Sequence, residues 1–189
     1  MGSLSLTDEP ARSATLEALR IARDAGAILS YDPNYRASLW PSAEVAAQQM
    51  RSVVGMMDLV KISTEETTLL TDESDPNEAA RKILAQGPRV VVVTLDEDGA
   101  MVVTPEGART VPSFRVNATD TIGAGDSFWG GFLCALLDSG KDVSGLTLDD
   151  AASFARFGNA VASLCVRERG AIPAMPSRDA VEEVLAANA

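Results

Sequence analysis

The run Val90 to Thr94 (VVVVT) is the feature that most limits how this chain can fold. Four valines in a row, without a polar break, are typical of a strand that is buried on both faces. Strands of this kind belong to mostly parallel sheets that carry helices on both sides. The run therefore predicts an α/β fold.

Strand-like and helix-like patterns alternate around this run, as a parallel sheet requires. Further strands are expected at 2–6, 27–31, 58–62, 100–104 and 108–116, the last two as an antiparallel pair. A first helix, capped by Thr7 or Asp8 with Pro10 in its first turn, is expected to run to about Ala25. Further helices are expected at about 42–56, 64–71, 76–86, 123–139, 148–166 and 177–187. Ligands of such sheets bind beyond the carboxyl ends of the strands, so polar residues that follow a strand are candidate site residues.

Composition removes several classes of function. The 189 residues include no histidine, which excludes Ser-His-Asp and Cys-His nucleophiles and histidine-containing zinc sites. A formal charge of −11 argues against nucleic acid as a partner. No apolar run reaches the roughly 18 residues that span a bilayer, and the first residues lack a signal-peptide pattern. We therefore expect one cytoplasmic domain over 1–189, with Cys134 and Cys165 reduced and buried.

The stretch at 120–131 (DTIGAGDSFWGG) is a candidate binding turn, because small residues precede an apolar, helix-like run. It fits neither common phosphate loop. The dinucleotide fingerprint needs a glycine where Phe128 stands, and the P-loop needs a lysine where Gly131 stands. We interpret the amides of 123–125 as an anion hole for a transferring phosphoryl group and Asp126 as the base that takes the proton of the attacking hydroxyl. A helix start that only permits tight packing is the alternative.

Five segments, in order, resemble the PfkB or ribokinase-like family of carbohydrate kinases. Residues 30–36 (SYDPNYR), followed by LWP, resemble the DPNxR segment of fructokinases and 2-keto-3-deoxygluconate kinases. Residues 60–66 (VKISTEE) resemble the NxxE segment, and 93–99 resemble the TLGxxG nucleotide turn. The stretch at 120–131 resembles the C-terminal signature, and 158–160 together with 169–173 resemble the closing helix and loop. This resemblance implies phosphorylation of a sugar hydroxyl by ATP, with fructose preferred over 2-keto-3-deoxygluconate.

The resemblance also implies roles for single residues. Catalysis would fall to Asp126 as base, with an anion hole at Gly123, Ala124 and Gly125. The ATP site would be lined by Ser63, Thr94, Gly99 and Asn159. Substrate would meet Asp126, Asn34 and Arg36. Mg²⁺ would be organised through water by Glu66, and a monovalent cation such as K⁺ would lie near Asp120, Ile122 and Gly170.

Several of these residues have plainer interpretations. Asp32-Pro33-Asn34 is also compatible with a simple turn, and Glu65-Glu66 with a solvated helix start. Thr94 can merely end a strand, and Asn159 can merely satisfy a buried helix contact. The chain also departs from the family: Asp96 stands where glycine is usual, and Ser63 where asparagine is usual.

The N-terminal end of the chain departs most from the pattern of the family. Family members are longer, and their N-terminal portion holds most sugar-binding residues and a β lid. We therefore expect the C-terminal part of a ribokinase-like αβα sandwich, with an uncovered sheet edge through which it associates, as a homodimer for example. We also expect little sugar kinase activity from this chain alone. A stand-alone nucleotide-binding module and a non-catalytic structural protein remain as alternatives.

Overall fold

The computed structural model describes residues 1–188. Its strands are β1 (Ser30–Tyr31), β2 (Leu59–Ser63), β3 (Val90–Thr94), β4 (Ala100–Thr104) and β5 (Gly107–Val111), hydrogen-bonded in the order β1-β2-β3-β4-β5. β1 and β2 run parallel, with Ser30 opposite Leu59. β4 and β5 are joined by a two-residue loop, which only antiparallel neighbours can use. The expected α/β fold is confirmed, and the sheet is mixed.

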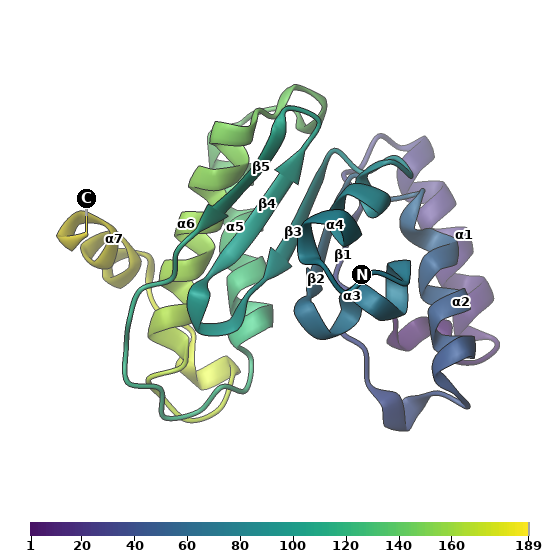
Figure 1. The fold of residues 1–189 in the computed structure, drawn as a ribbon, viewed down its shortest axis with the longest axis horizontal. Helices are drawn as coiled ribbons and strands as arrows, with labels where there is room; N and C mark the ends of the chain where they lie inside the picture. Colours follow the sequence, from purple (N-terminus) through teal and green to yellow (C-terminus); the bar gives the residue numbers. More distant parts are fainter. Residues whose placement is uncertain (189) are drawn as a thin grey trace. The chain divides into compact units, whose positions relative to one another are not determined.

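The chain divides into two compact units, the first of which comprises Met1–Val93 and Val103–Gly107. Its helices are α1 (Ala11–Asp24), α2 (Ala43–Val54), α3 (Thr64–Thr71) and α4 (Pro76–Leu84) (Figure 1). α3 packs against α2, α4 and β2. The first four residues of both β2 and β3 are buried, as the unbroken apolar run at 90–94 predicts. The candidate residues of this unit lie in the loop after β1, at the end of β2 and in the first turn of α3.

The second unit comprises Thr94–Val102 and the chain from Ala108 onward. Its helices are α5 (Ala124–Ser139), α6 (Leu148–Cys165) and α7 (Arg178–Ala187) (Figure 1). α5 packs closely along α6 because Gly158 leaves no side chain between them: a Cβ there would lie 2.7 Å from the Phe128 carbonyl oxygen. Val181 of α7 packs with Ala160 and Val161 of α6. This packing supports the helix whose first turn follows the glycine turn.

Three strand predictions were wrong or too long. Residues 2–6 form no strand, because Leu4–Leu6 is a 3₁₀ helix. The strand predicted at 108–116 ends at Val111, since Pro112 has no N–H to donate to a neighbouring strand. The strand predicted at 27–31 is reduced to Ser30–Tyr31.

The first residues cover part of the sheet edge that was expected to be open. The terminal amine of Met1 donates to the Ser30 carbonyl at 2.5 Å. The Asp32 amide donates to the Met1 carbonyl at 3.0 Å, and the Ser3 amide donates to the Pro33 carbonyl at 2.9 Å. Residues 1–3 therefore satisfy backbone groups beside β1 that an open edge would leave to another chain.

Both cysteines are free thiols. Cys165 is buried, but the expectation of a buried Cys134 was wrong: this thiol is half-buried and accepts a hydrogen bond from Arg178 at 3.2 Å. Within residues 1–188, no helix combines the length and the apolar character that a membrane crossing needs.

Candidate functional site

The glycine turn at 123–125 has a conformation that requires glycine. Gly123 has a φ of +81°, and a Cβ on it would lie 2.5 Å from the Cβ of Ala171. α5 begins at the next residue, and the Ser127 amide donates to the Gly123 carbonyl at 2.8 Å. The Ala124 amide donates to the Thr121 carbonyl at 3.1 Å, whereas no hydrogen bond within residues 1–188 uses the amides of Gly123 or Gly125. Two of the three amides predicted for the anion hole therefore face no acceptor of the described chain.

Asp126 is the third residue of α5 and lies exposed at the surface. The positive end of the helix dipole favours a carboxylate in this first turn. The structure thus places a solvent-accessible carboxylate one residue after two open amides. The roles of these amides as an anion hole and of Asp126 as a base stay predictions.

Asp120 ties the segment before the glycine turn to a later loop. Its two carboxylate oxygens accept hydrogen bonds from the Ile122 amide at 3.0 Å and from the Gly170 amide at 2.9 Å. These two hydrogen bonds lower the pKa of Asp120, and the bond from Gly170 has the larger effect. The three residues predicted for a monovalent cation are therefore neighbours, and cation binding itself stays a prediction.

The turn after β3 is shaped by two residues with positive φ. Gly99 has a φ of +102°, and a Cβ on it would lie only 2.2 Å from the Val111 carbonyl oxygen. Asp96, where the resemblance leads one to expect glycine, has a φ of +52°. Aspartate is among the few residues with a side chain that tolerate this left-handed conformation. The backbone requirement thus explains the usual glycine, and the Asp96 carboxylate is exposed.

Asn159 is buried on α6, with 3% of its surface exposed. Its side-chain Nδ2 donates to the Val111 carbonyl at 2.9 Å and to the Pro112 carbonyl at 3.2 Å. The side-chain nitrogen is therefore directed at the backbone of 111–112. The structure brings Asn159 near the turn of Gly99 through this segment, a relationship between residues 48 positions apart that no local pattern reveals.

In the first unit, the Glu66 carboxylate joins the loop after β1 to the end of β2. Oε1 accepts from the Tyr35 amide at 2.7 Å, and Oε2 accepts from the Ser63 amide at 2.8 Å. The residue is 6% exposed. This excludes the interpretation of Glu66 as part of a solvated helix start, and it gives the carboxylate two structural partners that the sequence did not indicate.

The same geometry bears on Mg²⁺. Among the residues that the structure describes, no three Asp, Glu, Cys or His side chains gather as a metal site. Mg²⁺ keeps several waters and takes one or two carboxylates together with substrate phosphates. Each Glu66 oxygen retains a second lone pair beside its amide partner, so contact through a water fits these residues better than direct ligation.

A buried ion pair also supports the loop after β1. Lys61 Nζ lies 2.9 Å from Asp32 Oδ2, with side-chain exposures of 8% and 12%. Asp32 Oδ1 accepts from the Asn34 amide at 3.2 Å. Burial, and to a smaller extent the carboxylates of Glu66 and Asp32, raises the pKa of the Tyr31 phenol. Sequence reasoning missed Lys61, although a single lysine inside the apolar strand LVKIS was an available signal.

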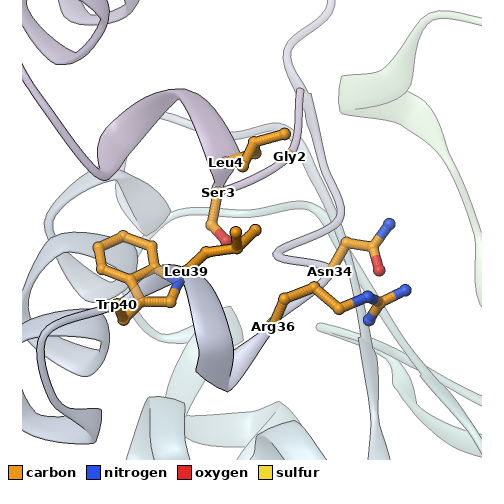
Figure 2. Close-up of a pocket in the computed structure, with 7 residues that line it drawn as sticks. All are labelled: Gly2, Ser3, Leu4, Asn34, Arg36, Leu39 and Trp40. Atoms are coloured by element: carbon orange, nitrogen blue, oxygen red, sulfur yellow. The ribbon is translucent and has the colours of Figure 1, made fainter.

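Asn34 and Arg36 line a pocket of about 400 Å³ in the first unit. Figure 2 shows their polar ends together on one side and the Trp40 ring on the other. Asn34 has a φ of +48°, and Arg36 donates from one guanidinium nitrogen to the Tyr35 carbonyl at 3.0 Å. The full lining is Gly2, Ser3, Leu4, Asn34, Arg36, Leu39 and Trp40. It contains no carboxylate, so its single charged group favours an anionic or strongly polar ligand.

The chain matches a protein-family model over most of its length. Residues 1–178 match the model described as "pfkB family carbohydrate kinase". The chain belongs to this family. Membership confirms the resemblance that the five sequence segments indicated.

Relatives within the PfkB family include plant and bacterial fructokinases. "Probable fructokinase-5" of Arabidopsis thaliana is 40% identical over 180 residues, which are 93% of this chain and 54% of the relative. A fructokinase of Xylella fastidiosa, solved with bound ATP, has a TM-score of 0.90 and 31% identity, over 99% of this chain and 60% of its own. A Vibrio cholerae fructokinase double mutant, solved with fructose, ADP and potassium, has a TM-score of 0.88 and 31% identity, over 96% and 58%. The chain spans about half the length of the curated relatives it matches.

Proposed function

We propose that this PfkB chain provides the phosphoryl-transfer part of a fructokinase-like sugar kinase, which phosphorylates a sugar hydroxyl with ATP. The identity to plant fructokinases and the likeness to fructokinases solved with ATP, or with fructose and ADP, support this reaction class. Phosphoryl transfer depends mainly on positioning and on stabilising charge, which is what a turn of open amides and a nearby base can supply.

The observation that carries the proposal is the placement of Asp126 directly after the glycine turn. The Asp126 carboxylate would take the proton of the sugar hydroxyl as that oxygen bonds to the terminal phosphorus of ATP. The bond from this phosphorus to the bridging oxygen breaks, and ADP leaves with the electron pair. The Gly123 and Gly125 amides would stabilise the charge on the transferring group. The Ala124 amide would contribute only after releasing the Thr121 carbonyl.

The substrate side of the proposal rests on the pocket of the first unit. Asn34 and Arg36 would hold polar groups of the sugar, and Trp40 offers an apolar wall. A neutral ketose such as fructose is preferred because the curated relatives are fructokinases. The alternative is 2-keto-3-deoxygluconate, whose carboxylate would suit the Arg36 guanidinium.

The cofactor part of the proposal is ATP with Mg²⁺, and K⁺ as an optional ion. Ser63, Thr94, Gly99 and Asn159 are proposed to shape or contact the nucleotide site. Mg²⁺ would arrive with the nucleotide phosphates and would add positive charge beside them. Glu66 would meet its waters, and Asp120, Ile122 and Gly170 would surround K⁺.

These 189 residues by themselves are proposed to bind nucleotide but to turn over little sugar, because they span only about half of a fructokinase relative. Calorimetry with ADP and a coupled assay for ADP release with ATP and fructose test the two parts. We expect ADP binding and no more than background release. Robust fructose-dependent release by the purified chain would contradict the second part. Absence of ADP binding would favour a non-catalytic structural protein.

A further inference from the structure

Asn159, Val111–Ser113 and Gly99 form a chain of contacts within the second unit. Asn159 Nδ2 holds the carbonyls of Val111 and Pro112 at 2.9 and 3.2 Å. The same backbone lies against Gly99 so closely that a Cβ on Gly99 would be 2.2 Å from Val111 O, 2.5 Å from Ser113 N and 2.8 Å from Pro112 C. No side chain can enter this contact.

The contact fixes the turn that follows β3. The Leu95 amide donates to the Gly99 carbonyl at 2.8 Å, and the Gly99 amide donates to the Asp96 carbonyl at 3.3 Å. Gly99 is buried, while Asp96 is exposed and has a φ of +52°. The buried end of the turn is therefore held by 111–113, and its exposed end is free to meet a ligand.

We infer that Asn159 is a positioning residue, which shapes the turn at 95–99 through the 111–113 backbone instead of touching the nucleotide. The inference rests on the proposed nucleotide site and gives one of its residues a different task. The buried Nδ2 contacts two backbone carbonyls, so the donor side of this amide is directed at the 111–113 segment and not at a ligand. Losing these bonds takes a buried donor away from two carbonyls and is expected to loosen the segment that supports Gly99.

The test combines substitutions at Asn159 and at Gly99, the two residues that contact the 111–113 backbone. Asn159→Asp keeps the side-chain size, removes both donors and sets a carboxylate against two carbonyl oxygens. Asn159→Ser is a milder second variant, should the first fail to fold. Gly99→Ala inserts a methyl group where Val111 O already lies. Ser163→Ala is the matched control, because Ser163 is buried on the same helix and donates only to the Ala160 carbonyl, at 2.8 Å.

Two measurements are made on the 189-residue chain: the Kd for ADP by calorimetry, and amide hydrogen exchange of Leu95 and Gly99 without nucleotide. We expect Asn159→Asp and Gly99→Ala each to weaken ADP binding by about tenfold, the size of one lost buried hydrogen bond. Both should speed exchange at Leu95 and Gly99. The Kd of the double variant for ADP should exceed that of the weaker-binding single variant by no more than about twofold. The effects of two substitutions that disrupt the same contact do not add. Ser163→Ala should leave both readouts unchanged.

Two outcomes would overturn the inference, and a third would overturn only the nucleotide site on which it rests. Weaker ADP binding by Asn159→Asp, with unchanged exchange at Leu95 and Gly99, would mean that Asn159 touches the nucleotide directly. A lower melting temperature with an unchanged Kd would make it a merely structural residue. Absence of ADP binding by the unmodified chain would remove the nucleotide site itself, whereas the exchange rates would still show whether Asn159 holds the turn.

Discussion

The Glu66 carboxylate accepts a hydrogen bond from the Tyr35 amide at 2.7 Å, across 31 positions of sequence. Its other oxygen accepts from the Ser63 amide at 2.8 Å. One buried side chain thus joins the loop that carries Asn34 and Arg36 to the end of β2. A residue expected to serve a metal ion therefore also sets the shape of the proposed substrate loop.

Replacing Glu66 by glutamine is expected to loosen this loop. Glutamine offers only one oxygen, so its NH₂ group would face either the Tyr35 or the Ser63 amide, donor against donor. Unfolding in urea should show a loss of about 1–3 kcal/mol, as for a buried hydrogen-bonding group left unsatisfied. Amide exchange at Tyr35 or Ser63 should become faster.

Glu65→Gln is the control for this change. Glu65 is the neighbouring residue on α3 and is exposed. Its substitution should alter the free energy of unfolding by no more than about 0.5 kcal/mol. Equal effects of the two substitutions would contradict the bridging role of Glu66.

Removing the cation of the buried pair is expected to cost more than removing both charges. Lys61→Met removes the ammonium that lies 2.9 Å from the buried Asp32 carboxylate and should destabilise the chain by about 3–5 kcal/mol. Asp32→Asn combined with Lys61→Met removes the carboxylate charge as well, so the double variant should be more stable than Lys61→Met alone. Chemical denaturation of the three proteins measures this order. A double variant less stable than Lys61→Met would show that Asp32 matters more through the Asn34 amide than through the ion pair.

The sequence predicted the regular elements well where their signal is local. Helices α2 to α7 and strands β2 to β4 lie within a few residues of the expected ranges, because apolar periodicity and the VVVVT run reflect burial directly. The ends of β1 and β5 were misjudged, since pairing partners decide where a strand stops. The Asn159–Val111 and Glu66–Tyr35 bonds join residues 48 and 31 positions apart, so no window of sequence contains both partners.

The Asp120 bridge predicts a specific dependence of stability on pH. Hydrogen bonds from the Gly170 and Ile122 amides lower the pKa of Asp120 in the folded chain, so folding favours its charged form. The stabilisation is therefore present above the ordinary aspartate pKa of about 4 and is lost as the pH falls through the lowered value. Asp120→Asn should remove this component. The difference in unfolding free energy between the unmodified chain and Asp120→Asn should be constant above about pH 5 and shrink below about pH 4. If this difference in unfolding free energy grew on acidification, the hydrogen bonds to Asp120 would not stabilise its charged form.

Asp126→Asn tests the base in a protein that can turn over sugar. We would use a chimera that joins this chain to the N-terminal half of a fructokinase, because the chain spans 54% of such a relative. Asparagine keeps the size of the side chain but cannot take the hydroxyl proton. Turnover should fall by about 10²- to 10⁴-fold, the usual contribution of general acid–base catalysis, while the Kd for ATP stays within about twofold.

Asp179→Asn is the control, since Asp179 is an exposed aspartate in the first turn of α7. If Asp126→Asn retained turnover within about tenfold of the parent chimera, the proton would have another acceptor, and the division of labour between the glycine turn and Asp126 would have to be abandoned.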